Sequence, residues 1–78
     1  MLPYEEEVRQ ILSDTLGIPV GKISEKDDLQ YFGMDSLNSI LLIVALEKFF
    51  EIQIPEEKIG MKYVRNIYDI CRLVCEVK

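Results

Sequence analysis

A serine stands at the predicted start of a helix, in the segment Gly33-Met34-Asp35-Ser36-Leu37. Asp35 suits the N-cap position, where a carboxylate accepts hydrogen bonds from first-turn backbone N–H groups, and Ser36 then takes the first helical position. Its hydroxyl should be exposed at a helix N-terminus, which attracts negative charge. The chain has no histidine, and no lysine stands close in sequence, so nothing activates Ser36 as a nucleophile. The site instead suits receipt of a phosphate group from an external enzyme.

Three other side chains carry hydroxyl or thiol groups of interest. Ser39 lies one turn after Ser36, but it lacks a preceding aspartate and the place at the helix rim, so it is the weaker acceptor. Cys71 and Cys75 are four residues apart on the last predicted helix, where their Cβ directions suit a disulfide poorly. We predict that both are reduced core residues. Two cysteines without histidine cannot complete a tetrahedral zinc site, and no metal site is predicted.

Composition excludes several classes of protein. The chain has 78 residues and a net charge of −5, and its nine lysines and arginines are scattered, which argues against binding of nucleic acid. The longest apolar run, residues 40–46, is far shorter than the roughly 20 residues of a membrane-spanning helix. The first residues do not resemble a signal peptide, and a cytoplasmic location follows by default. We expect residues 1–78 to form one domain, with nothing that demands more than a monomer.

Four helical patterns must position these groups. The first begins near Pro3, has Glu5, Glu6 and Glu7 in its first turn, and stops at Gly17. A long connection, residues 17–34, follows; Tyr31 and Phe32 should pin it, with the apolar anchors Ile18, Val20, Ile23 and Leu29. The second helix runs from Ser36 to about Glu51. A single-turn helix opens at Pro55 and ends at Gly60, and the last helix runs from about Tyr63 or Val64 to Glu76.

The second helix is apolar around nearly its whole circumference, which predicts either full enclosure or an extra apolar face for a partner. We expect Leu37, Ile40 and Val44 to form its buried stripe and Leu41 to point outward. The last helix should bury Val64, Ile67, Tyr68, Cys71, Val74 and Cys75. The fold class predicted is all-α, a four-helix bundle with a short third helix and a long first loop.

Asp35-Ser36-Leu37, within the run from Phe32 to Ile40, resembles the modification motif of acyl carrier proteins and related carrier domains. The resemblance covers essentially the whole chain, because three outer landmarks fall in register with the motif. These are Leu16-Gly17-Ile18, Ala45-Leu46-Glu47 and the run from Phe50 to Pro55. Without these landmarks, the tripeptide Asp-Ser-Leu would not indicate the family.

The resemblance implies that Ser36 carries 4′-phosphopantetheine, transferred from coenzyme A by a separate magnesium-dependent phosphopantetheinyl transferase. The thiol of this arm would hold acyl groups as thioesters for loading, condensing and transfer enzymes, so the chain itself would not be an enzyme. Asp35 would cap the helix and orient the transferase, Gly33 would keep the rim open, and Leu37 would anchor the modified turn to the core. Met34 would either touch the arm or fill the edge of the loop.

The resemblance also implies two further sets of residues. The second helix would be the main recognition surface, with a partner-facing strip of Asn38, Leu41, Val44, Glu47 and Lys48. An apolar cleft lined by Leu46, Phe50 and Ile54 would shelter the acyl chain. Carriers of fatty acid synthesis usually place acidic residues where Asn38 and Leu41 stand, so the partner surface here should be more apolar.

That departure favours a specialised pathway, such as polyketide biosynthesis, over housekeeping fatty acid biosynthesis. The alternatives are an aminoacyl or peptidyl carrier of a non-ribosomal peptide type of pathway and a helical interaction domain with unmodified Ser36. A third, an enzyme that uses its own serine or cysteine, is remote because histidine is missing.

Overall fold

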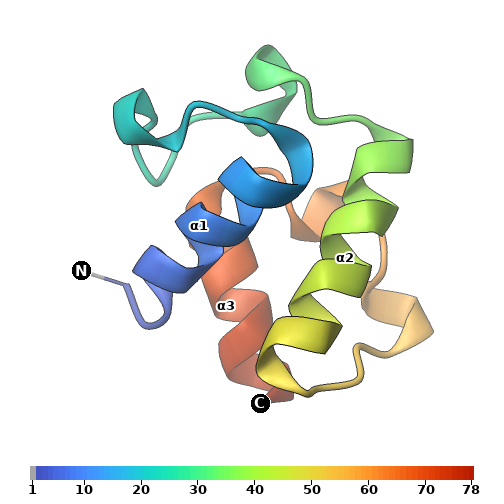
Figure 1. The fold of residues 1–78 in the computed structure, drawn as a ribbon. Coiled ribbons are helices and arrows are strands. Elements are labelled where there is room, and N and C mark those ends of the chain that lie inside the picture. Colours follow the sequence, from blue (N-terminus) through green and yellow to red (C-terminus); the bar gives the residue numbers. More distant parts are fainter. Residues whose placement is uncertain (1) are drawn as a thin grey trace.

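The computed structural model describes residues 2–78, with the side chain of Val20, a predicted loop anchor, outside the described part. Three α-helices, α1 (Glu5–Leu16), α2 (Ser36–Phe50) and α3 (Ile67–Val77), alternate with short 3₁₀ turns. Residues 2–78 contain no β-strand. Helix α1 packs against both α2 and α3, and the connection from α1 to α2 arches over one end of the helices (Figure 1). Within the described residues, no helix has the length and apolarity needed to cross a bilayer.

Helix α1 begins at Glu5, two residues after the start predicted at Pro3. Tyr4 occupies the N-cap with φ 61°, a left-handed conformation, and its ring packs edge-to-face on Phe50 at a centroid distance of 5.3 Å. This packing compensates the backbone strain at Tyr4. Gly17 ends α1 as predicted: its φ is 68°, and its N–H donates to the Ser13 carbonyl oxygen at 3.0 Å.

The long connection is held by buried side chains and by backbone hydrogen bonds in its interior. Ile18, Ile23 and Leu29 are buried as predicted, and Phe32 is half-buried. Tyr31 is 85% exposed, so the prediction that it pins the loop is wrong. Two backbone hydrogen bonds fasten the loop to the start of α3 instead: Leu29 N–H to the Arg65 oxygen at 2.8 Å, and Tyr68 N–H to the Glu25 oxygen at 3.0 Å.

The predicted short third helix is not an α-helix. Residues Glu56–Lys58 and Met61–Tyr63 form two separate 3₁₀ turns, so the described chain has three α-helices rather than four. Gly60, with φ 156°, lies between the turns in a conformation that breaks helical continuity. Helix α3 starts at Ile67, three or four residues later than predicted. Asn66 is its N-cap, because its side chain accepts a hydrogen bond from the Asp69 N–H at 2.7 Å.

Helix α3 buries most of the predicted stripe, and Ile70 and Leu73 join it in the core. Cys71 is buried, and desolvation raises the pKa of its thiol to about 12. Tyr68 is half-buried. Cys75 is exposed, so its predicted place in the core is wrong; in the last turn of α3 the packed face runs through Val74 and Val77 instead.

Helix α2 turns a different face to the core from the one predicted. Leu42, Ile43 and Leu46 are buried together with Ser39, whose exposed fraction is 2%. Leu37, Ile40 and Val44 were predicted to be buried, but they are 67%, 51% and 43% exposed. Leu41 points outward as predicted. The exposed apolar surface formed by Leu37, Ile40, Leu41 and Val44 is called the α2 apolar face below.

Glu51 ends α2 in the left-handed conformation, with φ 54°. A residue with a Cβ is disfavoured there, and glycine is not, so Glu51→Gly is expected to stabilise the fold by about 1 kcal/mol. Urea unfolding followed by circular dichroism measures this difference. Glu51→Ala is the matched control, because it removes the carboxylate and retains the strain. A Glu51→Gly protein no more stable than Glu51→Ala would refute the strain argument.

Candidate functional site

The start of α2 is built as the sequence predicts. Asp35 is the N-cap, and its Oδ1 atom accepts a hydrogen bond from the Asn38 backbone N–H at 2.8 Å. Ser36 is the first residue of α2, and its side chain is exposed. The first N–H groups of a helix lack partners within the helix, and the macrodipole favours negative charge at this end. An anionic group on Ser36 is therefore electrostatically favoured.

A shallow hollow of about 250 Å³ lies beside Ser36, lined by Ser36, Ser39, Ile40, Ile59, Gly60 and Met61. The Ser36 hydroxyl contacts the Met61 sulfur, with 3.8 Å between Oγ and Sδ. Ser39 lies inside, where its hydroxyl donates to the Ser36 carbonyl oxygen at 2.7 Å. Sequence reasoning missed Ile59 and Met61 as neighbours of Ser36, because no local signal relates residues 25 positions apart.

The residues around Ser36 divide into buried and exposed ones. Met34 is 4% exposed, so of the two predicted alternatives it fills the edge of the loop. Gly33 has φ 105°, a conformation that suits glycine, and ends the 3₁₀ turn Leu29–Phe32. Leu37 does not anchor the modified turn to the core as predicted, because it points into solvent as part of the α2 apolar face. Ser39 takes the inward place of this turn.

The predicted partner strip is only partly free for a partner. Leu41, Val44 and Lys48 are exposed. Asn38 is half-buried, and its Nδ2 atom donates to the Gly33 carbonyl oxygen at 2.9 Å. The Glu47 carboxylate accepts from the Ile54 backbone N–H at 2.9 Å, so it supports the chain as it leaves α2. The strip that faces outward is thus more apolar than the sequence pattern implied.

The three predicted cleft residues lie in or beside the packed core. Leu46 and Ile54 are 0% and 3% exposed. Phe50 is half-buried and packs edge-to-face on Tyr4 and on Phe49, with ring centroids 5.3 and 4.9 Å apart. These side chains fill the space between the helices, so a chain sheltered there would have to displace them.

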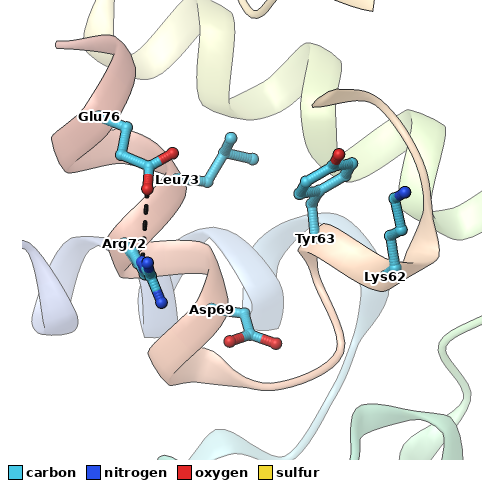
Figure 2. A pocket seen from close by; sticks show the side chains of 6 residues that line it. All are labelled: Lys62, Tyr63, Asp69, Arg72, Leu73 and Glu76. Atoms are coloured by element: carbon cyan, nitrogen blue, oxygen red, sulfur yellow. Dashed lines mark hydrogen bonds and ion pairs between the residues drawn. The ribbon is translucent and has the colours of Figure 1, made fainter. Parts of the chain in front are cut away.

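A second hollow, of about 240 Å³, lies on the side of α3 that carries charged residues (Figure 2). Its lining contains none of the predicted site residues. Glu76 is paired there with Arg72, at 3.3 Å, and also with Lys58 outside the lining, at 2.7 Å. The hydrogen bond from Lys58 lowers the pKa of the Glu76 carboxyl. These two ion pairs lie at the exposed surface, where such pairs contribute little to stability.

Comparison with known proteins places this geometry in a family. Residues 6–74 match the family described as "Phosphopantetheine attachment site". The carrier protein from Agrobacterium tumefaciens, in a crystal structure with engineered Bradyrhizobium japonicum glycine:[carrier protein] ligase and ATP, is 27% identical and superposes with a TM-score of 0.85. The match covers 94% of this chain and 97% of that one. The same complex with AMP gives 27% identity and a TM-score of 0.84, covering 91% and 97%.

A solution structure of a holo acyl carrier protein from Nitrosomonas europaea matches with a TM-score of 0.80 at 23% identity, covering 94% of this chain and 93% of that one. At that identity the likeness establishes the all-helical fold. The chain therefore belongs to the phosphopantetheine-binding carrier protein family. Members of this family carry 4′-phosphopantetheine as a prosthetic group and are not themselves catalytic.

The residues present fit such a group. The start of α2 offers an exposed hydroxyl at the positive end of a helix, and the hollow beside it has an apolar wall formed by Ile40, Ile59 and Met61. A phosphodiester suits the former, and the alkyl part of the arm suits the latter. When bound, the group supplies a thiol at its free end. None of the residues that line the hollow carries a thiol.

Proposed function

We propose that Ser36 is the attachment point of the phosphopantetheine arm and that residues 1–78 form a single carrier domain. The observation that carries this proposal is the exposed Ser36 hydroxyl at the capped start of α2, inside the matched region. In the attachment step, the Ser36 hydroxyl gives up its proton to the transferase and its oxygen bonds to the phosphorus that bears the pantetheine arm. The P–O bond of the coenzyme A pyrophosphate breaks, and adenosine 3′,5′-bisphosphate leaves. The arm would supply the thiol to which partner enzymes attach their intermediate as a thioester.

The mass of the intact protein tests this function. After incubation with coenzyme A, Mg²⁺ and a broad-range phosphopantetheinyl transferase, the protein should gain one phosphopantetheinyl group. A folded protein whose mass never changes with transferases of several specificities would favour the helical interaction domain, with the α2 apolar face as its binding surface.

Two classes of cargo remain: acyl groups of fatty acid, polyketide or related biosynthesis, and amino acids. The match to the carrier crystallised with a glycine ligase favours amino acids as the cargo. That carrier is 27% identical to this chain over nearly its whole length. Incubating the modified chain with that ligase, glycine and ATP, and in parallel with an acyl-loading enzyme and its acyl donor, distinguishes them by the mass gained.

We further propose that the α2 apolar face contacts the partner enzymes. Leu41 is 47% exposed near the middle of this face, so Leu41→Glu should weaken docking about tenfold or more by placing a charge where the partner is apolar. The rate of cargo loading at limiting carrier concentration measures this effect, with circular dichroism to confirm helicity. Lys22→Glu, an exposed charge change outside α2, is the control. Equal loading by the Leu41→Glu protein and the unaltered chain would remove Leu41 from the docking surface.

A further inference from the structure

The outer side of α2 carries no acidic side chain over most of its length. Residues 36–46 contain no charged residue at all. Asp35 lies just before this stretch, where its carboxylate caps the helix by accepting from the Asn38 N–H at 2.8 Å. Glu47 lies just after it, and its half-buried carboxylate accepts from the Ile54 N–H at 2.9 Å. Both carboxylates therefore serve hydrogen bonds within the chain, at the two ends of an uncharged surface.

Lys48 is the only basic residue of α2, and it borders the α2 apolar face. It is exposed and lies one turn after Val44 on the same side of the helix. Among the described residues, none forms an ion pair with Lys48. The surface that α2 offers to a partner is thus apolar along Leu37, Ile40, Leu41 and Val44 and positive at its far end.

This surface distinguishes between two kinds of partner. At a distance, the net charge of −5 attracts a basic protein, and exposed carboxylates such as Glu6 and Asp14 on α1 contribute to that field. On contact with α2, however, a patch of lysines and arginines would lose its hydration, find no carboxylate along residues 36–46 and be repelled by Lys48. An apolar patch would bury the α2 apolar face, and a carboxylate at its edge would pair with Lys48.

We propose that the enzymes that dock on α2, beginning with the transferase that modifies Ser36, present an apolar patch with an acidic side chain facing Lys48. Enzymes that dock through a basic patch are disfavoured. This inference rests on the proposed attachment at Ser36 and adds the chemistry of the partner to it. It also makes the sign of a charge change on α2 the deciding observation.

The test compares two phosphopantetheinyl transferases, one with an apolar, acid-edged docking patch and one with a patch rich in lysine and arginine. The readout is kcat/KM for transfer to the unmodified chain at 50 mM NaCl. With the apolar-patch transferase, Lys48→Glu should lower kcat/KM about three- to tenfold, and Lys48→Gln should lower it less. With the basic-patch transferase, the double variant Leu41→Glu/Lys48→Glu should raise kcat/KM about tenfold, because it supplies the missing carboxylates.

Lys22→Glu is the control, because it makes the same change in net charge as Lys48→Glu at an exposed position outside α2. It should alter kcat/KM by less than about twofold with either enzyme, and circular dichroism confirms that each variant is folded. An apolar-patch transferase that modifies Lys48→Glu as fast as the unaltered chain, or faster, would overturn the proposal. So would a basic-patch transferase that gains nothing from the double variant. Failure of the proposed function appears differently, since neither transferase would then add a group to the unaltered chain.

Discussion

Replacing Ser36 with alanine is expected to abolish attachment of phosphopantetheine, so that the mass of the Ser36→Ala protein stays constant under conditions that modify the unaltered chain completely. The reason is chemical, because the variant lacks the oxygen that must bond to phosphorus. The fold should survive, since Ser36 is exposed at the start of α2 and its hydroxyl contacts the weakly accepting Met61 sulfur at 3.8 Å. Circular dichroism checks the fold, and intact mass checks the modification.

Ser39→Ala is the matched control, one turn further along α2. Ser39 is 2% exposed and its hydroxyl donates to the Ser36 carbonyl oxygen, so a transferase has no access to it in the folded chain. The Ser39→Ala protein should still gain one group, at a cost in stability of about 1 kcal/mol for the lost hydrogen bond. A full mass gain in Ser36→Ala that disappears in Ser39→Ala would show that the group is attached to Ser39, contrary to the proposal.

Replacing Leu46 with alanine is expected to reduce the free energy of unfolding by about 2–5 kcal/mol. Leu46 is 0% exposed in the core, where truncation leaves a cavity that the neighbouring helices only partly fill. Small domains have total stabilities of roughly 5–15 kcal/mol, so this one change removes a large share of it. Urea unfolding monitored by circular dichroism gives the difference directly.

Leu41→Ala is the matched control on the same helix. Leu41 is 47% exposed on the α2 apolar face, and its truncation should reduce the stability by less than about 1 kcal/mol. The pair also tests the sequence-based prediction that Leu46 lines a cleft. Similar small losses for both leucines would mean that Leu46 borders open space, contrary to the packed core described above.

The parts of the fold that the sequence predicted depend on neighbouring residues. Asp35 before Ser36 sets the start of α2, and Gly17 sets the end of α1, because cap chemistry acts within a few residues. The same kind of signal was present but overlooked at Asn66. Val64 is apolar and in register with Ile67, so the periodic pattern extended the last helix backward past its real cap.

The buried face of α2 was not predictable in the same way. Apolar residues occur all around this helix, so the 3.6-residue period does not distinguish Leu37, Ile40 and Val44 from Leu42, Ile43 and Leu46. Ser39 is the one polar residue that α2 buries. It is tolerated inside because its hydroxyl bonds to the carbonyl oxygen one turn earlier.

The candidate site was predicted at the level of its serine and cap, and less well beyond them. The roles of Asn38 and Glu47 depend on carbonyl and N–H groups of loops, at Gly33 and Ile54, whose paths no local pattern specifies. The same holds for Met61. It reaches Ser36 because the chain that contains the two 3₁₀ turns, residues 56–63, passes the N-terminal end of α2. Long-range contacts of this kind needed the three-dimensional arrangement.

The most direct test of the proposed function is a fragmentation mass spectrum of the modified chain, taken on a peptide that contains both Ser36 and Ser39. We predict that every fragment retaining the phosphopantetheinyl group includes Ser36 and that fragments containing Ser39 without Ser36 are unmodified. A spectrum that places the group on Ser39, or on any residue outside the start of α2, would contradict the central claim.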